Sequence, residues 1–294
     1  MSVGEPPRPQ TLTPEENLKA ILESPSYVLA EEDRALLKRD ELRPARLQLE
    51  LLKPELAFQE NGIVSTIVLF GGTRIVSEEA ARERLGAARA ALEADPDDAE
   101  LARRVAVAER VLDKSPYYEV AREFARIVST RRQRSGHREC VVVTGGGPGI
   151  MEAGNRGAFE VGEKSIGLNI TIPHEQVPNP YITPELCFQF HYFALRKMHF
   201  LMRARAMVAF PGGFGTMDEL FETLTLIQTG KMKRIPIVLV GRKFWRGAID
   251  MEYLVEEGTI APHDPDLVTY AETAEEIWDI VDSFPEDGGE KVLR

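Results

Sequence analysis

The sequence predicts an α/β protein built on a doubly wound parallel sheet. Buried apolar runs alternate with helical patterns, which is the typical order of strands joined by crossover helices. Three of the runs end in glycine-rich turns, and ligands bind at the carboxyl ends of the strands in such sheets. The runs that we predict to be strands are 65–70, 139–144, 165–170, 206–210 and 235–240.

The N-terminal part of the chain predicts a tail followed by helices. Residues 1–13 are polar and rich in proline, and Thr13 followed by Pro14 is a typical helix start. Residues 31–60 are rich in helix-forming residues with helically spaced leucines. We therefore expect a tail and helical extension over 1–60, with its leucines packed on the sheet domain or a second subunit, and one catalytic domain over 61–294.

A helical insertion is expected between the first two strands. Residues 78–114 form two charged amphipathic patterns that are interrupted at Asp95–Asp98. We predict an inserted helical hairpin at about 75–115. Its mixture of acidic and basic side chains indicates a solvated or interacting surface and not a pocket.

The second half of the domain predicts further helices and one long loop. We expect the loop at 171–186, which contains four prolines together with His174 and Glu175. A single histidine in a loop is usually solvated, so no catalytic role is assigned to His174. The expected helices are 117–132, 191–204, 244–257 and 274–283.

The helix expected at 191–204 has two distinct faces. Leu195, Met198 and Met202 form an apolar stripe, which is more often core than a cofactor site. Arg196 shares the other face with His199 and Arg203. Its guanidinium group can hold a phosphate or carboxylate with two hydrogen bonds, although a salt bridge to a surface acid is the alternative.

The composition limits the classes of function. A net charge of −11 and a pI near 5.1 argue against a general binder of nucleic acid or anionic membranes. The chain lacks an apolar signal segment and a membrane-spanning run, so we expect a soluble, cytoplasmic protein. Cys140 and Cys187 show no metal-binding spacing, and we expect no metal and no cofactor.

The glycine turns predict an anion site. The turn after the first strand contains Gly71, Gly72 and Thr73, and a second turn spans 145–149. Such turns expose backbone N–H groups beside helix N-termini, where phosphate is stabilised. The strand at 165–170 ends with Asn169 and Ile170 and brings no acidic residue for a dinucleotide ribose, which disfavours NAD.

The third turn, 211–215, follows the strand at 206–210 and precedes a helix. Thr216 and Glu219 have the spacing of a capping box, in which the two side chains would bind the first N–H groups of that helix. Alternatively, Glu219 faces the ligand and acts as a catalytic carboxylate. The local sequence leaves both interpretations open.

These motifs together resemble the LONELY GUY (LOG) type of nucleoside 5′-monophosphate phosphoribohydrolases, long described as lysine decarboxylases. The resemblance covers roughly 65–240 apart from the insertion. It rests on PGGFGTMDE (211–219), on Arg196-Lys197 upstream of it, and on GGGPGIME (145–152). The turn GGTR at 71–74 departs from the family, whose members commonly carry a serine in this turn, so substrate preference is not transferred.

The resemblance implies a Rossmann-like fold, a homodimer or higher homo-oligomer, and hydrolysis of a nucleoside 5′-monophosphate to free base and ribose 5-phosphate. It implies that Arg196 and Glu219 are the catalytic pair and that 212–216 hold the phosphate. A non-catalytic nucleotide carrier or sensor on the same fold is the alternative. The expected substrate-binding residues are Gly71, Gly72, Thr73, Gly145, Gly146, Gly147, Gly149, Met151, Lys197, Gly212, Gly213, Gly215 and Thr216.

Overall fold

The computed structural model describes residues 12–172 and 177–285, and its contacts divide the chain into two units, Met1–Glu50 and Leu51–Arg294. The first unit is helical. Thr13 caps α1 through a capping box with Glu16, as expected from a threonine followed by proline. Its elements are α1 (Pro14–Glu23), α2 (Arg34–Leu37) and the beginning of α3 (Arg43–Glu60), with short 3₁₀ turns at Pro25–Tyr27 and Asp40–Leu42.

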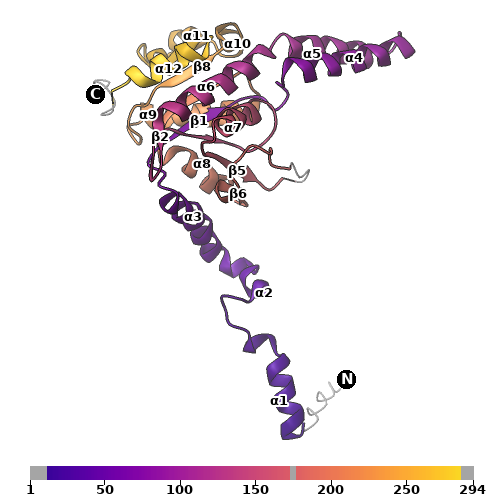
Figure 1. Ribbon diagram of the computed structural model, residues 1–294, viewed down its shortest axis with the longest axis vertical. Coiled ribbons are helices and arrows are strands. Elements are labelled where there is room, and N and C mark those ends of the chain that lie inside the picture. Colours follow the sequence, from indigo (N-terminus) through magenta and orange to yellow (C-terminus); the bar gives the residue numbers. More distant parts are fainter. Residues whose placement is uncertain (1–11, 173–176, 286–294) are drawn as a thin grey trace, which may run out of the picture. The chain divides into compact units, whose positions relative to one another are not determined.

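The second unit contains a seven-stranded parallel sheet in the order β6-β5-β4-β1-β7-β8-β9 (Figure 1). The predicted strands are all present, and the chain adds β6 and β9 at the two edges. The strands are β1 (Thr66–Phe70), β4 (Val141–Thr144), β5 (Ser165–Ile170), β6 (Cys187–Phe190), β7 (Ala204–Ala209), β8 (Ile237–Val240) and β9 (Val268–Ala271).

The strand order reverses direction at β1. From β1 the chain adds β4, β5 and β6 on one side, then crosses to the other side to form β7, β8 and β9. The carboxyl ends of β4, β1 and β7 therefore meet where the order reverses, which is the usual ligand site of an open α/β sheet. The predicted doubly wound fold is confirmed.

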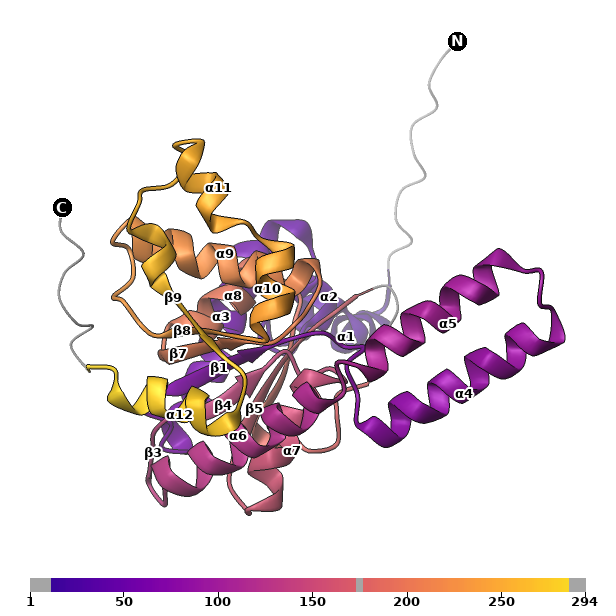
Figure 2. The same ribbon diagram turned by 90° about the horizontal axis from the view of Figure 1, so that it is seen from above.

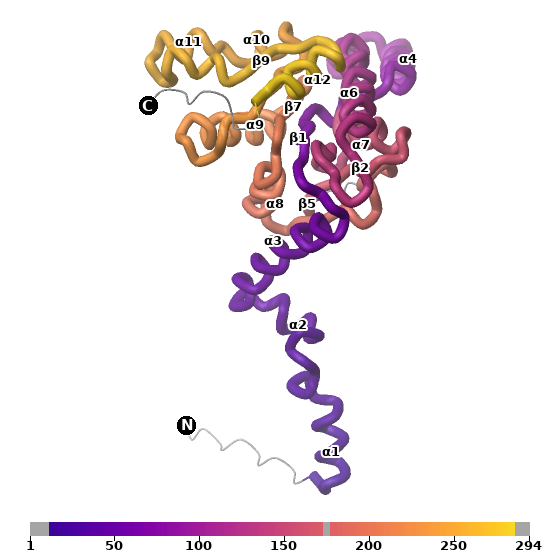
Figure 3. The backbone as a smooth tube through the Cα atoms, turned by 60° about the vertical axis from the view of Figure 1, so that its left-hand side comes forward, coloured from indigo at the N-terminus to yellow at the C-terminus, as the bar shows by residue number. Residues whose placement is uncertain are grey.

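Helices cover both faces of the sheet (Figures 2 and 3). One layer contains α6 (Pro116–Arg132), α7 (Ile150–Glu160) and α12 (Ala274–Ser283), and the other contains α8 (Phe193–Leu201), α9 (Phe214–Gln228) and α10 (Arg242–Ala248). Ile67 and Leu69 of β1 belong to the core that the sheet forms with α6, α7 and α12 on one face. Phe70 points to the other face, where its ring centroid lies 4.8 Å from that of Phe200 in α8. Because both faces are covered, β1 is apolar from Ile67 to Phe70.

The inserted hairpin consists of α4 (Glu78–Ala94) and α5 (Ala99–Leu112), and it extends beyond the sheet in Figures 1 and 2. Ser77 and Asp98 cap the two helices with their side chains. An ion pair of 2.8 Å between Arg89 and Glu109 joins them. The break at Asp95–Asp98 was correctly predicted.

One sequence-based assignment differs from the structure, and one small element was not expected from the sequence. The stretch expected as one helix at 244–257 forms α10 and a separate α11 (Met251–Glu256), because the Asp250 side chain caps a new start. The basic segment after α6 forms a small antiparallel hairpin of β2 (Gln133–Arg134) and β3 (His137–Arg138), for which the sequence shows no apolar pattern.

The faces of α8 were also predicted wrongly. Met198 is 47% exposed and Met202 is exposed as well, whereas His199 is only 2% exposed. The His199 ring lies between the rings of Phe58 and Phe190, and its Nδ1 is 3.4 Å from the Glu55 carboxylate. Aromatic and acidic neighbours from distant segments thus place the histidine, not a methionine, in the core.

No helix of the described residues is long and apolar enough to cross a bilayer.

Candidate functional site

The three glycine turns meet at the carboxyl edge of the sheet. The Gly72 N–H donates to the Pro211 carbonyl at 2.9 Å, which joins the turns after β1 and β7. The Ile150 N–H donates to the Gly72 carbonyl at 3.3 Å, which joins the turns after β1 and β4. The strand order therefore brings together turns that are far apart in the sequence, as predicted.

Gly149 is the residue that permits this close approach. Its φ of 73° is left-handed, and a Cβ atom there would lie 2.5 Å from the Gly72 carbonyl oxygen. Backbone atoms of Thr73 would be 2.8 Å away, so Thr73 lies against the second turn. Only glycine allows the first and second turns to touch.

Replacing Gly149 by alanine is therefore expected to destabilise the fold by about 1–3 kcal/mol, from the strained φ alone, with the clash adding to this. Urea unfolding would measure the change. Gly86→Ala is the matched control, because no atom lies within 4 Å of a Cβ atom at that position in α4. The control should leave stability unchanged or raise it by about 0.5–1 kcal/mol. Equal effects of the two substitutions would contradict the packing of the turns.

The helices that begin at these turns have uncapped N-termini. Neither Gly149 before α7 nor Gly213 before α9 supplies a side-chain cap. The Gly149 carbonyl accepts from the Ala153 N–H, and the Gly213 carbonyl accepts from the Met217 N–H. By contrast, side chains cap α1, α4, α5 and α12. Free amides and two positive helix ends thus point to one edge, an arrangement that binds an anion.

The capping-box interpretation of Thr216 and Glu219 is wrong. α9 begins at Phe214, so Gly213 is the capping residue and no side chain closes its first turn. The Thr216 hydroxyl instead lies against Gly212, and a Cβ atom on Gly212 would be only 2.2 Å from the hydroxyl oxygen. The N–H groups of 214–216 have no partner within the helix, and no atom crowds Gly213 or Gly215.

Glu219 is a buried carboxylate beside these amides. It is 5% exposed, and its side chain has no hydrogen bond to another described residue. Burial raises its pKa to about 7, although the positive charges of Lys197 and Arg196 act in the opposite direction. An acid held near half-ionisation at neutral pH is typical of catalytic carboxyl groups.

Arg196 is held in the site by its neighbours. Its Nε donates to the Leu168 carbonyl at 2.7 Å, and its guanidinium group lies 5.1 Å from the Phe200 ring centroid. A Cβ atom on Gly145 would lie 2.6 Å from Nη2, so the glycine leaves space for this group. Burial lowers the pKa of Arg196, and the Glu219 charge opposes that shift. The structure thus brings the predicted pair close enough to interact.

Met151 and Asn169 line the second turn. The Met151 sulfur would lie 2.9 Å from a Cβ atom on Gly145, on the same spot that Arg196 covers. Gly146 has a φ of 73°, and the Asn169 side chain would lie 2.4 Å from a Cβ atom there. In the sequence, Asn169 only disfavours NAD, but its position near the carboxyl end of β5 is the signal for a site residue.

A buried polar network that the sequence did not reveal fixes the second turn. The Thr144 hydroxyl donates to the Asn155 side chain at 2.7 Å and accepts from the Gly146 N–H at 3.0 Å. The Asn179 amide donates to the Asn155 oxygen at 2.9 Å and to the Gly147 carbonyl at 3.1 Å. Satisfied networks of this kind rigidify a site.

Lys197 does not point freely toward the turns. Its ammonium group forms ion pairs of 2.8 Å with Asp218 and 3.0 Å with Glu222 of α9. Burial acts to lower its pKa, but the hydrogen bonds to these two acids and the negative charges of Glu219 and Glu222 together outweigh burial and raise it. In this structure Lys197 therefore acts on Glu219 through its charge.

The raised pKa of Glu219 predicts the pH dependence of a reaction that needs its ionised form. The protonated acid dominates below pH 7, so kcat/KM should fall about tenfold per pH unit there and level off above pH 7. Initial rates between pH 5 and 9 would check this profile. Activity that falls as the pH rises through 7 would assign Glu219 the role of proton donor instead.

His174 and Glu175 lie outside the described residues. Among the residues that the structure describes, no group of three or more His, Cys, Asp or Glu side chains could hold a metal ion.

Comparisons with known proteins show which families and structures this chain is similar to. Residues 151–281 match the family model described as "Possible lysine decarboxylase". A probable cytokinin riboside 5′-monophosphate phosphoribohydrolase of Oryza sativa subsp. japonica, LOGL3, is 26% identical over 153 residues, which are 49% of this chain and 68% of that protein. The Arabidopsis thaliana enzyme LOG3 is 28% identical over 141 residues, which are 47% of this chain and 64% of that protein.

The chain thus spans about two thirds of the length of these relatives. Among solved structures, a molybdenum cofactor binding protein from Rippkaea orientalis is similar with a TM-score of 0.40 and 17% identity. That alignment covers 57% of this chain and 86% of the other.

Proposed function

This chain belongs to the family of LONELY GUY-type phosphoribohydrolases, and from this premise we propose that it hydrolyses the N-glycosidic bond of a nucleoside 5′-monophosphate. The products are the free base and ribose 5-phosphate. The observation that carries the proposal is the buried Glu219, with a pKa of about 7, beside Arg196 and an uncapped helix N-terminus. The substrate class is AMP-like or resembles the cytokinin riboside monophosphates in the relatives' names.

The 5′-phosphate binds at the start of α9. The N–H groups of 214–216 donate to its oxygens, and the positive end of the helix stabilises its charge. Gly213 and Gly215 leave the approach open, since no atom lies within 4 Å of a Cβ atom at either position. This anchoring fixes the ribose relative to Glu219, and positioning of this kind lowers a barrier by several kcal/mol.

Glu219 acts on the ribose. Cleavage of an N-glycosidic bond develops positive charge on the sugar, as in glycoside hydrolysis, and an ionised carboxylate stabilises that charge or orients the attacking water. Water adds its oxygen to C1′, the bond from C1′ to the base nitrogen breaks, and a proton passes to the base. The low solvent exposure of Glu219 strengthens its electrostatic effect.

Arg196 keeps Glu219 ionised and in place. Its charge lowers the pKa of the carboxyl group against the effect of burial. Its bond to the Leu168 carbonyl orients the guanidinium group and leaves its terminal nitrogens over Gly145 for the substrate. Met151 faces the same position, so we assign it and Asn169 to the wall around the ribose and base.

The family description as a lysine decarboxylase is not supported by the site. Pyridoxal chemistry needs a buried lysine available for a Schiff base. The lysine nearest in sequence to Arg196 is Lys197, and its ammonium group is engaged by Asp218 and Glu222.

We also propose a cytoplasmic homo-oligomer, with residues 61–294 as the catalytic domain. Met198, Met202, Phe214 and Phe221 expose apolar surface on α8 and α9. Exposed apolar side chains on two helices provide surface that a second subunit could cover. Cys140 and Cys187 are free thiols, which suits a reducing compartment.

The experiment that tests the function incubates purified protein with AMP, GMP, CMP or UMP and measures free base by chromatography. We expect base and ribose 5-phosphate in equal amounts from at least one of the four. Purified Glu219→Gln protein, prepared identically, controls for contaminating nucleosidases. Tight binding of a nucleotide without release of base would support the carrier or sensor alternative and reject the hydrolase.

A further inference from the structure

The inserted hairpin carries a groove that the proposed function does not use. This hairpin groove has a volume of about 320 Å³, and Ala81, Ala88 and Val107 form part of its apolar floor. Val107 is 39% exposed. Apart from Arg74, which follows the turn after β1, every lining residue belongs to α4 or α5. Figure 2 shows these two helices side by side and extending away from the sheet, so the groove has room for a further helix.

Four arginines line the hairpin groove, and no acidic residue does. Arg103 forms an ion pair of 2.8 Å with Glu100, and the charge of Arg104 also acts on that carboxylate. Arg74 and Arg84 form no hydrogen bond or ion pair with another described residue. The fold therefore leaves these two guanidinium groups available to carboxylates from outside the hairpin.

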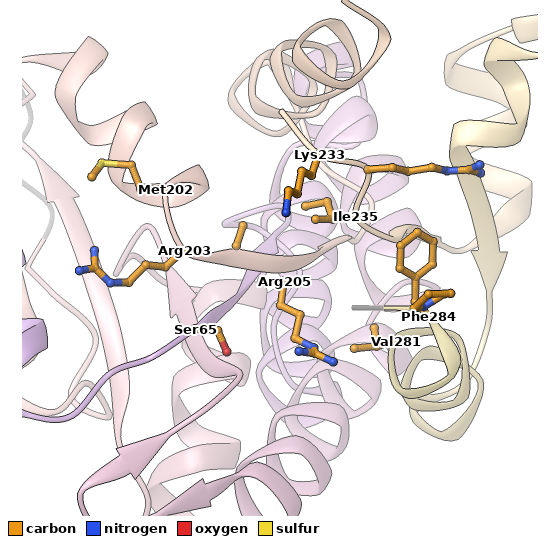
Figure 4. A pocket seen from close by; sticks show the side chains of 11 residues that line it. Ser65, Met202, Arg203, Arg205, Lys233, Ile235, Val281 and Phe284 are labelled. Carbon is orange, nitrogen blue, oxygen red and sulfur yellow. The ribbon is translucent and has the colours of Figure 1, made fainter. Parts of the chain in front are cut away.

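The other basic cavity of the sheet unit differs in this respect. It lies at the amino ends of β1 and β7 (Figure 4). Arg203 is paired there with Glu55, Arg234 donates to the Asp266 carbonyl, and Arg205 is likewise engaged. Most of its cations thus serve the fold itself, unlike those of the hairpin groove.

The lining of the hairpin groove indicates the chemistry of its occupant. It contains no aromatic side chain, whereas proteins that hold single-stranded nucleic acid stack its bases on such rings. An apolar floor between two helices fits the apolar face of an amphipathic helix. Arginines beside that floor select a helix or segment that carries carboxylates.

The chain itself contains an acidic segment of this kind. Residues 12–33, which we call the N-terminal arm, contain six acidic residues and a single lysine. Lys19 is already paired with Glu23 at 3.9 Å. Glu15, Glu31 and Glu32 form no hydrogen bond or ion pair through their side chains with another described residue. The arm thus offers free carboxylates where the groove offers free arginines.

The N-terminal arm also exposes apolar surface. Leu18, Ile21 and Leu22 of α1 are 57%, 45% and 58% exposed, and no residue of this helix is buried. Their spacing places them on one face. A helix of ten residues is marginal in water without packing. α1 therefore needs an apolar surface to cover this face.

The connectivity favours a groove on another copy of the chain. The arm joins the sheet unit through α3, which precedes the amino end of β1. The hairpin follows the carboxyl end of the same strand. The two attachments thus lie at opposite ends of β1, which favours exchange between copies over docking within one chain.

We propose that the N-terminal arm of one copy docks in the hairpin groove of a second copy. The apolar face of α1 covers the floor of the groove, and the free carboxylates of the arm pair with Arg74 and Arg84. This contact assigns a role to both additions that surround the first strand. It is separate from the apolar surface of α8 and α9 and does not depend on hydrolysis of a nucleotide.

Cross-linking between two full-length chains tests the proposal. One chain carries Leu22→Cys and the other Val107→Cys, with different tags, and the co-purified chains are treated with a short bis-maleimide that joins two thiols. We expect a covalent dimer that contains both tags. Ala106→Cys is the matched control for Val107→Cys, because this neighbouring residue is exposed but does not line the groove. Cys187 is present in every chain, so the control also reports its background.

A charge reversal tests the arginines in the same assay. Arg84→Glu in the chain with Val107→Cys replaces attraction by repulsion and should lower the yield of mixed dimer about fivefold. Arg82→Glu makes the same charge change on an exposed residue of α4 outside the lining and should leave the yield unchanged. Thermal melts verify that each variant is folded.

Equal yields with Val107→Cys and Ala106→Cys would overturn the proposal, as would equal yields with Arg84→Glu and Arg82→Glu. A single chain that carries both Leu22→Cys and Val107→Cys provides the remaining check. Cross-linking within this chain, without any mixed dimer, would show that the arm docks on its own hairpin and would overturn the exchange between copies. None of these results requires turnover, so they stand apart from the test of the proposed function.

Discussion

Replacing Glu219 by glutamine is expected to lower the rate of base release by about 100-fold or more, which corresponds to about 3 kcal/mol. The amide has nearly the same shape but cannot carry the negative charge that stabilises an oxocarbenium-like sugar. The backbone N–H groups of 214–216 that bind the phosphate remain in place, so the dissociation constant for AMP should change little. Single-turnover rates and equilibrium binding measured on the same protein would separate the two effects.

Asp218→Asn is the matched control for this substitution. It removes a carboxylate from the preceding position of α9, and that side chain is mostly exposed and paired with Lys197. The control should retain most of the activity. Near-normal AMP hydrolysis by Glu219→Gln would remove Glu219 from the mechanism, whatever the result for Asp218→Asn.

Replacing Arg196 by glutamine is the second large effect that we expect. The loss of its charge removes a contribution that keeps the pKa of Glu219 down, so this pKa should rise above 7. The acidic limb of the rate profile should then move to higher pH, and activity at pH 7 should fall by about 100-fold through combined loss of ionisation and substrate contact. Initial rates between pH 5 and 9 would measure both changes.

Arg196→Lys distinguishes charge from hydrogen bonding. A lysine keeps the positive charge but lacks the planar group that reaches the Leu168 carbonyl and covers Gly145. Compared with Arg196→Gln, this variant should recover most of the original pH dependence but little of the lost maximal rate. Arg126→Gln, which removes an arginine paired with Glu123 on the surface of α6, should change neither. An unchanged profile for Arg196→Gln would contradict the coupling between Arg196 and Glu219.

The central strands and the glycine turns could be predicted because their signals are local. A strand buried on both faces is a continuous apolar run, as in 67–70, and a glycine turn after it is visible in the sequence. The edge strand β6 was missed because it is only four residues long and alternates buried and less buried positions after a proline-rich segment. β9, at the other edge of the sheet, also mixes buried and exposed positions and was missed for the same reason.

The site could be predicted only in part because its environment is assembled from distant segments. The capping-box spacing of Thr216 and Glu219 was present, but the helix begins two residues before Thr216, and this register decides that Glu219 faces inward. The raised pKa of Glu219 depends on burial by the fold. The network of Thr144, Asn155 and Asn179 joins three segments whose polar residues look unremarkable in sequence.

The most direct measurement is a crystal structure of the Glu219→Gln variant soaked with AMP. We predict a phosphate oxygen about 3 Å from the amide nitrogens of Gly215 and Thr216, with the ribose between the side chains at 196 and 219. A nucleotide seated elsewhere, with the start of α9 vacant at saturating AMP, would contradict the account.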